Sequence, residues 1–574
     1  MGEVGGTRGR VSRLTDPART PVLVSGAGPV GTTLALELAA RGVDVTLVEE
    51  RTGVTPHPKA TLLGARSMEI FRRHGLADAV LAAGIPGHLP YYIVFTTRVA
   101  TRELHRFNSA TSAQGCTPAA LAASRYPESA WSPYAKTQIG QQALEPVLHV
   151  HAARQPRIAF LRGTRLESFE QDAGGVRATL LDVASGARRS VAADYLAGCD
   201  GGGRGSVRAA LGIRYVGRGA MRANASFFFR SRQFLELSGR GIANLYFVFQ
   251  PGCYGVFTAI DGAELWNYQY YYLDPDRRID TSEAAPILFA AFGRPFDFEI
   301  VAINHWQHHQ SVAERWREGR VFLAGDAAHL FAPTGGVGMN TGISDAENLA
   351  WKLAAVLRGW GGPALLDSYE QERKPVAVRN SLVSASNSDR IDMVMAETPD
   401  DIDVEGERGE RLRAELARKI KGLARQFNSA GVHLGYRYFD SPICIGDGSL
   451  EPPDDTARVT PSTWPGSRAP HAWLADGRST LDLFGDGFTL LAFTDAAASA
   501  AESADLAEAA RARGVPLRVE RIDDPRIREL YERDFVLVRP DGHVAWRGDA
   551  APAGPAADAL IGTATGADPS GAGH

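Results

Sequence analysis

Residues 22–31 of the chain read VLVSGAGPVG. An apolar run ends in a GxGxxG pattern, and a helical pattern follows from about residue 30 to Arg41, with Gly42 where a helix C-cap belongs. Residues 45–48, Val-Thr-Leu-Val, form a second apolar run. A strand, a helix and a strand in this order predict a βαβ unit, and therefore a parallel sheet near the N-terminus.

The GxGxxG pattern has a complete physical explanation as a dinucleotide site. Gly26 permits a tight turn, Gly28 lets a pyrophosphate approach the backbone, and Gly31 lets the helix pack closely on the strand. The helix N-terminus offers N–H groups to phosphates, and an acidic residue at the end of the second strand accepts hydrogen bonds from ribose hydroxyls. The motif alone does not separate NAD from FAD. The residues predicted to bind the dinucleotide here are Gly26, Gly28, Pro29, Gly31, Glu49 and Glu50.

Downstream segments have a different periodicity. Residues 223–273 contain three aromatic-rich runs, at residues 226–229, 245–249 and 266–272, and are broken by Pro251-Gly252 and Asp261-Gly262, which predicts an antiparallel meander. A strand-like run at residues 321–324 then leads into a second glycine-rich turn and a long helix, so the first sheet is expected to be discontinuous in sequence. From about residue 460 a further strand, helix, strand and hairpin pattern predicts a separate α/β unit.

The predicted fold class is therefore α/β, with a Rossmann-like (GxGxxG) dinucleotide-binding domain, an inserted antiparallel-sheet domain expected to bind substrate and a C-terminal α/β domain. The expected boundaries are 20–95, 132–215 and 305–400 for the dinucleotide domain, 96–131 and 216–304 for the substrate domain, 401–459 for a helical connection, 460–550 for the C-terminal domain and 551–574 for a flexible tail.

Composition excludes several classes of function. The 574 residues carry a net charge of −4, which offers no basic surface for nucleic acid. No apolar run is long enough to span a membrane, and the polar, Arg-rich start does not resemble a secretory signal. The four cysteines are scattered without metal-ligand spacing. We therefore expect a cytoplasmic protein with free thiols and no metal.

Two later motifs decide between the cofactors. The first is Gly-Cys-Asp-Gly at residues 198–201, and the second is Gly-Asp-Ala-Ala-His at residues 325–329, followed by Pro333 and a glycine-rich stretch at residues 335–340. With the GxGxxG pattern, and in this order, they resemble the class A flavoprotein monooxygenases, the FAD-dependent aromatic hydroxylases. The resemblance covers residues 20–380. It implies that Asp326 holds the ribityl chain of FAD and that Asp200 lies near both FAD and the nicotinamide nucleotide.

Further residues take their expected roles from the same resemblance. Arg66 lies on the family's helix beside the flavin, Gln141 matches a glutamine that contacts FAD, and Lys59 stands where an arginine is frequent. The loop and helix N-terminus after Pro333 are expected to face the flavin, where a helix dipole stabilises negative charge. The cofactor-binding residues predicted in this loop are Gly338, Met339 and Asn340.

The C-terminal unit resembles the thioredoxin-like domain of the phenol-hydroxylase branch. The nearest resemblance is to phenol, 2,4-dichlorophenol and hydroxybiphenyl hydroxylases and to hydroxylases of antibiotic biosynthesis. The unit has no CxxC motif, so we expect packing or contacts in a homo-oligomer, not redox chemistry.

The resemblance implies an enzyme that uses FAD with NADPH or NADH and O₂. In this family the reduced flavin takes up O₂ at C4a, and the hydroperoxide transfers OH to an electron-rich ring, ortho or para to an existing hydroxyl. The expected substrate is a phenol, a hydroxypyridine or a polyketide-type intermediate. Baeyer–Villiger or epoxidising chemistry on the same scaffold, and an FAD-binding partner without turnover, remain open alternatives.

The substrate is expected between the flavin and the meander. Alternation along residues 266–272 places Trp266, Tyr268, Tyr270 and Tyr272 on one face, and Asn267, Gln269 and Tyr271 on the other. The residues predicted to take part in catalysis are Pro333, Tyr268 and Tyr270. The alternative is that these aromatics only stabilise the sheet. No general base is evident near Thr61, and a meander tyrosine or His105 remains a candidate for that role.

Overall fold

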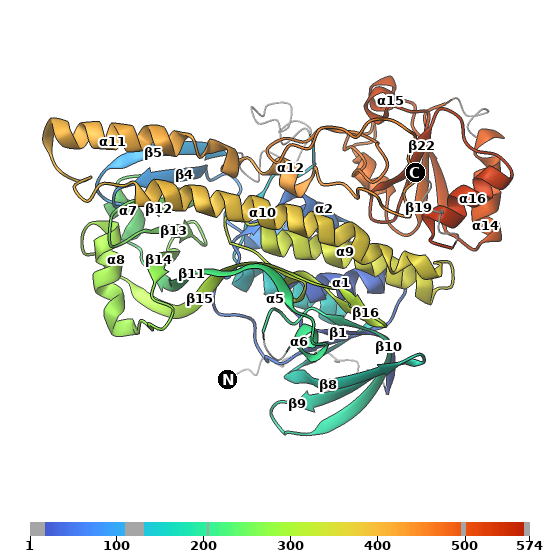
Figure 1. The fold of residues 1–574 in the computed structure, drawn as a ribbon, viewed down its shortest axis with the longest axis horizontal. Coiled ribbons are helices and arrows are strands. Elements are labelled where there is room, and N and C mark those ends of the chain that lie inside the picture. Colours follow the sequence, from blue (N-terminus) through green and yellow to red (C-terminus); the bar gives the residue numbers. More distant parts are fainter. Residues whose placement is uncertain (1–17, 110–130, 204–205, 495–500, 568–574) are drawn as a thin grey trace, which may run out of the picture.

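The computed structural model describes residues 18–109, 131–203, 206–494 and 501–567. Residues 110–130 of the predicted substrate domain and residues 568–574 of the predicted tail lie outside these ranges. Within them, the predicted parallel sheet is present (Figure 1), with β1 paired in parallel to both β2 and β10. The strands of its main path, in spatial order, are β16 (Arg317–Glu318), β17 (Val321–Leu323), β10 (Arg188–Gly198), β1 (Arg19–Ser25), β2 (Val45–Glu49) and β7 (Ile158–Arg162). A hairpin of β8 (Thr164–Asp172) and β9 (Gly175–Asp182) extends from β10.

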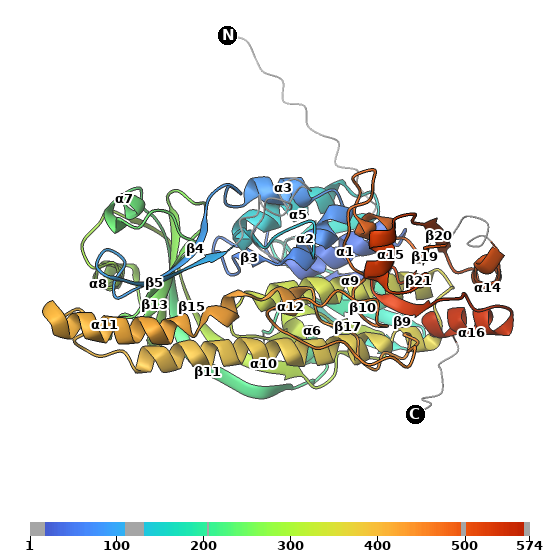
Figure 2. The ribbon, with the colours of Figure 1, turned by 90° about the horizontal axis from the view of Figure 1, so that it is seen from above.

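Helices cover this sheet and connect it to the rest of the molecule. Helix α9 packs against α1 and α10, which explains why it is buried on nearly every side. In Figure 2, α10 runs lengthwise from the C-terminal unit on the right to the substrate sheet on the left. The helices of this layer are α1 (Pro29–Ala40), α2 (Ala65–Arg73), α3 (Ala77–Ala83), α5 (Gln141–Arg154), α6 (Val207–Ala210), α9 (Val337–Leu357) and α10 (Ser368–Ala396). Among the described residues no helix is both long and apolar enough to cross a membrane.

The aromatic meander forms part of an eight-stranded sheet. Its strands, in spatial order, are β18 (His329–Leu330), β15 (Glu299–Ala313), β11 (Tyr215–Arg230), β14 (Leu265–Leu273), β13 (Gly255–Ala259), β12 (Leu245–Val248), β4 (Tyr91–Thr96) and β5 (Glu103–Ser109). The predicted domain boundaries at 95/96 and 304/305 are wrong, because they fall inside β4 and β15. Both strands belong to this sheet along their whole length, since β4 pairs with β12 and β15 pairs with β11.

The two faces of this sheet are covered differently. One face packs on α7 (Phe234–Ser238) and α8 (Ala284–Phe292) through a dense aromatic cluster. The other face packs on the end of α10 and on α11 (Gly406–Lys421), which belongs to the predicted helical connection. The predicted connection therefore covers one face of the substrate sheet as well as linking two domains.

The C-terminal unit contains the predicted strands and helix. Its sheet has the order β20 (Leu517–Arg521), β19 (Phe488–Ala492), β21 (Phe535–Val538) and β22 (Val544–Gly548), with α14 (Ala504–Ala512) and α15 (Pro525–Tyr531) beside it. The prediction of a flexible tail from residue 551 is wrong for residues 555–564, which form helix α16. Pro555 starts this helix at a position that suits proline, and Leu560 and Ile561 bury their side chains against the unit.

Candidate active site

The GxGxxG turn has the geometry that its glycines predict. Gly26 has a φ of +97°, and a Cβ there would lie 2.5 Å from the carbonyl oxygen of Cys199. A Cβ on Gly31 would lie 1.9 Å from the Gly26 oxygen, whereas one on Gly28 would meet no atom within 4 Å. Gly28 and Pro29 line a large cavity, and no side chain of the described part of the chain caps the N-terminus of α1. The free N–H groups of the helix therefore face a space that suits a phosphate.

Glu49 ends β2 beside this turn and is ionised. Its Oε2 accepts a hydrogen bond from the Ala27 N–H at 3.0 Å, and its Oε1 accepts from Nε of Arg51 at 2.9 Å. Burial alone would raise the pKa of Glu49, but the Arg51 side chain and the Ala27 N–H lower that pKa below its ordinary value. A fixed carboxylate at this position can accept hydrogen bonds from ribose hydroxyls.

The cavity has a volume of about 1020 Å³, at the upper end of the ~300–1,000 Å³ usual for a small-molecule pocket. It extends from the dinucleotide loops to the second sheet, so it offers room for a cofactor and a second ligand. The predicted residues that line it are Gly26, Gly28, Pro29, Glu49, Glu50, Lys59, Gln141, Asp200, Asp326, Pro333, Gly338 and Met339. A groove of similar volume along the outer surface of α10 contains none of the predicted residues.

Asp200, in the Asp-Gly motif, has one carboxylate oxygen paired and one unpaired. Its Oδ2 accepts from the backbone N–H of Val207 at 2.9 Å and from the Ser25 hydroxyl at 3.3 Å. Its Oδ1 is buried without a partner among the described residues. Burial raises the pKa of Asp200 to about 6, against the opposing effect of these hydrogen bonds. An unpaired buried oxygen at a cavity wall indicates a missing donor, such as a ligand hydroxyl or amide.

Asp326, in the Gly-Asp motif, presents its side chain to the cavity from a tight turn. The turn is held from below, where Oδ2 of Asp345 accepts from the backbone N–H of Gly325 and bonds Nε2 of His329 at 2.8 Å. Nε of Arg373 donates to the other oxygen of Asp345 at 2.9 Å. Asp345 and Arg373 could not be identified from the sequence, because their positions in two long helices carry no local signal.

Asn340 does not line the cavity, which corrects its predicted role as a cofactor ligand. Its Oδ1 accepts from the Gly64 N–H at 2.7 Å and from the Ser67 hydroxyl at 2.6 Å. Its Nδ2 donates to the carbonyl oxygens of Leu62 and Gly336. All hydrogen-bonding groups of the amide are therefore used inside the protein, where they fix the glycine-rich loop against residues 62–67. Gly31 also lies outside the cavity lining, consistent with its packing role.

The predicted role of Arg66 in cofactor binding is also corrected. Its side chain is buried away from the cavity and pairs with Glu347 at 2.8 Å and with Glu69 at 3.0 Å. Glu69 also pairs with Arg468 of the C-terminal unit. Arg66 thus belongs to a buried ionic network that joins α2 and α9 to that unit, and a sequence motif cannot distinguish such a cation from a ligand-binding one.

The predicted catalytic role of Tyr268 and Tyr270 is also corrected, because both side chains lie on the face of β14 that points away from the cavity. Tyr268 is fully buried, stacks on Phe257 and donates its hydroxyl to the Cys253 carbonyl at 2.8 Å. Tyr270 packs against the same aromatic cluster. Neither lines the cavity, whereas Gln269 and Tyr271 of the opposite face do. The aromatic face is the one that α7 and α8 cover.

The substrate end of the cavity is mostly apolar. Its lining residues come from the second sheet, the end of α10 and the connection: Ile93, Asn244, Leu245, Phe247, Val256, Thr258, Gln269, Tyr271, Ile391, Gln426, Phe427 and Ser429. Among the described lining residues, every carboxylate lies on the cofactor side. His105 does not line the cavity and packs on Phe107, so the structure does not place it as a base.

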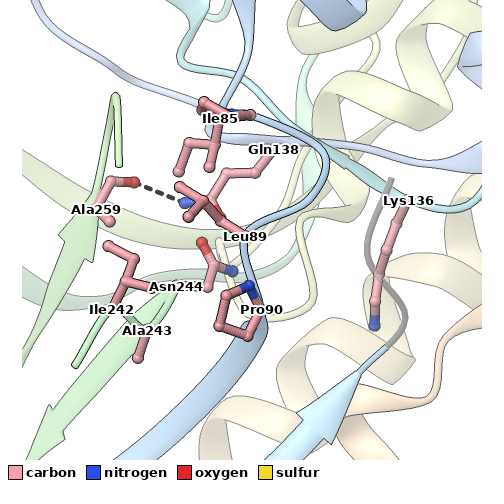
Figure 3. Close-up of a pocket in the computed structure, with 10 residues that line it drawn as sticks. Ile85, Leu89, Pro90, Lys136, Gln138, Ile242, Ala243, Asn244 and Ala259 are labelled. Carbon is pink, nitrogen blue, oxygen red and sulfur yellow. Dashed lines mark hydrogen bonds between the residues drawn. The ribbon is translucent and has the colours of Figure 1, made fainter. Parts of the chain in front are cut away.

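A second, much smaller cavity adjoins the substrate end (Figure 3). It has a volume of about 20 Å³, enough for roughly one water molecule, and shares Lys136 and Asn244 with the large cavity. Within it, Nε2 of Gln138 donates to the Ala259 carbonyl at 2.6 Å. This cavity is too small for a ring, so the large cavity is the candidate active site.

The cofactor side fits a flavin dinucleotide. The uncapped start of α1 with the open surface at Gly28 suits a pyrophosphate, and the ionised Glu49 suits a ribose. The unpaired oxygen of Asp200 and the cavity-facing Asp326 can accept from further hydroxyl or amide groups. These groups and the adjoining, largely apolar chamber are the arrangement expected of an enzyme that binds a dinucleotide next to a second ligand.

Comparisons with known proteins identify the class. Residues 19–382 match the FAD binding domain family, and residues 462–566 match the C-terminal domain of aromatic-ring hydroxylases. Aklavinone 12-hydroxylase RdmE of Streptomyces purpurascens is 36% identical, with 93% of this chain and 96% of that protein covered. The chain therefore belongs to the FAD-dependent aromatic-ring hydroxylases; it is an enzyme, and it binds FAD.

Solved structures agree with this assignment. The rebeccamycin biosynthetic enzyme RebC with reduced flavin superposes with a TM-score of 0.85 at 38% identity, covering 96% of this chain and all of that one. A ternary complex of aklavinone-11 hydroxylase with FAD and aklavinone superposes with a TM-score of 0.75 at 33% identity, covering 95% and 99%. The predicted fold class and family are thus confirmed.

Proposed function

We propose that this enzyme uses NADPH or NADH and O₂ to hydroxylate a flat, electron-rich aromatic ring of the polyketide type, ortho or para to a hydroxyl group. The observation that carries the proposal is that one cavity has the groups suited to a dinucleotide at one end and a lining rich in apolar and aromatic side chains at the other. Aklavinone, named in the ternary complex above, is a ligand of that related enzyme and supports a polycyclic substrate here.

The bound FAD supplies the oxygen-activating chemistry, and the chain supplies position and environment. Phe247, Phe427 and Tyr271 give the ring flat apolar contacts and exclude water from it. At the other end, the N-terminus of α9 and the loop at Pro333 point toward the same cavity. A helix N-terminus there favours the anionic form of a reduced flavin ring.

Tyr271 is the residue we assign to the substrate hydroxyl. Burial raises the pKa of Tyr271 to about 12, with the nearby Arg222 opposing the shift. The phenol of Tyr271 is protonated at neutral pH and can donate a hydrogen bond to the substrate hydroxyl, which would stabilise a phenolate form of the substrate. Arg222 lies 4.1 Å from the centre of the Tyr271 ring and pairs with Asp392 of α10, which fixes the ring's position.

The test is a panel of phenols and hydroxylated polycyclic rings, with oxidation of NADPH and of NADH followed in the presence of ¹⁸O₂. We expect at least one ring compound to accelerate NAD(P)H oxidation and to gain one ¹⁸O on a ring carbon. Label in a new ester would instead indicate Baeyer–Villiger chemistry. An enzyme whose NAD(P)H oxidation no ring compound accelerates would refute the proposal.

A further inference from the structure

Gln426 closes the substrate end of the cavity from the connection between α11 and α12 (Ala430–His433). Its side chain is only 6% exposed. Neither its Oε1 nor its Nε2 has a hydrogen-bond partner within residues 18–109, 131–203, 206–494 and 501–567. A buried carboxamide with both polar atoms unpaired is unfavourable unless a ligand or water provides the missing partners. Because Gln426 is a lining residue of the cavity, a ligand bound there is the nearest source of partners for its amide.

The backbone that carries Gln426 is held in place by its neighbour. Phe427 lies 6.2 Å from the ring of Phe247 and 6.0 Å from the ring of Phe95, both on the second sheet. Nζ of Lys136 donates to the Phe427 carbonyl at 2.8 Å. The backbone at Gln426 is therefore held in place before any ligand binds, which reduces the conformational entropy lost when its side chain forms a hydrogen bond.

The lining around Gln426 combines amides with apolar side chains, and it includes the cation of Lys136, whose Nζ donates to the Phe427 carbonyl. Asn244 is also 6% exposed, and its Oδ1 has no hydrogen-bond partner among the residues that the structure describes. Asn244 and Gln269 of β14 both line the cavity. The remaining lining at this end is largely aliphatic and aromatic. Amides spaced around an apolar slot can read hydroxyl or carbonyl oxygens, since each amide offers both a donor and an acceptor.

We propose that Gln426 is a specificity-determining residue, which selects aromatic substrates by a hydrogen bond to an oxygen substituent of the ring. The proposal rests on the proposed function for the identity of the ligand as an oxygenated aromatic. A site that leaves its own buried amide unpaired discriminates against an analogue that lacks the oxygen.

The test uses the FAD-loaded enzyme and a set of ligands that differ by one hydroxyl: 1-naphthol and its 1,5-, 1,6- and 1,8-dihydroxy counterparts. Dissociation constants come from the change in flavin absorbance on titration, which requires no turnover. The Gln426→Met variant keeps the size of the side chain and removes its hydrogen bonds. The matched control is Gln250→Met, because Gln250 is also buried, with an unpaired Oε1, but does not line the cavity.

We expect the wild type to bind at least one dihydroxynaphthalene more tightly than 1-naphthol. Q426M should weaken the binding of that ligand about 10- to 100-fold, in line with the loss of one hydrogen bond to a buried group. The binding of 1-naphthol should weaken less than about 3-fold. Q250M should keep the wild-type preference. A wild type without any preference, or a Q426M enzyme that retains it or loses both ligands equally, would overturn the proposal. Selective binding without hydroxylation would refute the proposed function alone.

Discussion

The two ends of the cavity are lined by different kinds of chemical group. The cofactor end consists of backbone turns and carboxylates: Gly26 and Gly325 take positive φ angles, and Glu49, Asp200 and Asp326 surround the space. The substrate end has no carboxylate among its described lining residues and depends on the side chains of a sheet face. A change at the cofactor end therefore alters charge or backbone shape, whereas a change at the substrate end alters surface shape and hydrogen bonding.

The two faces of the nine-residue strand β14 have different roles. Trp266 and Tyr268 are fully buried against the α7 and α8 cluster, while Gln269 and Tyr271 line the cavity. Tyr272 departs from the alternation, since its φ is +61° and its hydroxyl donates to Asp392 at 2.8 Å. One face of the strand thus stabilises the fold, and the other is available for recognition.

The largest expected effect is on the packed face. Trp266 is 0% exposed and stacks on Phe234 with a centroid distance of 4.0 Å. Trp266→Ala should lower the free energy of unfolding by about 3–5 kcal/mol, because it leaves a large cavity in the core. Denaturant unfolding measures this loss. A W266A protein as stable as the wild type, or one whose folded fraction has an altered ligand preference, would contradict the division of the strand into two faces.

At the cofactor end, Asp200 should make stability depend on pH. Its pKa in the folded state is raised from 3.8 to about 6, so its ionisation costs the folded protein free energy. The cost is absent below the unfolded pKa, grows as the pH rises from about 4 to about 6, and is complete above that, at up to ~3 kcal/mol.

Asp200→Asn keeps an acceptor for the Val207 N–H and has no such cost. In FAD-free protein, D200N should therefore gain stability relative to the wild type as the pH rises, reaching a plateau near pH 7. Denaturation curves between pH 4.5 and 7.5 measure the difference. A difference that does not change over this range would show that the carboxylate is not shifted.

Asp326 should affect affinity for FAD more than folding. Asp326→Ala is expected to weaken FAD binding by roughly 1.5–3 kcal/mol per lost hydrogen bond, and Glu49→Ala should do the same at the adenosine end. Asp389→Ala serves as the control, since Asp389 pairs with Arg218 on the surface. FAD retention is measured by titration of the stripped protein. If D326A and E49A both bind FAD as tightly as D389A, the assignment of the cofactor end is wrong.

The smallest changes are expected when the hydroxyl group of Tyr268 or of Tyr271 is removed. Tyr268→Phe loses the bond to the Cys253 carbonyl and should cost about 0.5–1.5 kcal/mol of stability without changing ligand binding. Tyr271→Phe should change stability by less than about 0.5 kcal/mol and weaken the binding of phenols to the holoenzyme. The opposite pattern would reassign the faces of β14.

These contrasts explain what the sequence could predict. The cofactor end was predictable because Gly26, Gly28 and Asp326 occupy fixed positions in local motifs, and their geometry follows from a few neighbouring residues. The substrate end was not, because alternation separates the faces of β14 but does not say which face a helix covers. Arg66 and Asn340 have motif positions yet serve packing, since their partners lie far away in sequence.

The most direct test of the central claim, that cofactor and ring share this one cavity, is a crystal structure of the enzyme with FAD and a bound phenol. We predict electron density for the phenol ring against Tyr271 and Gln269, with the flavin against the loop at Pro333 and Met339. A ring bound on the Tyr268 and Tyr270 face of β14, or outside the cavity, would contradict the account.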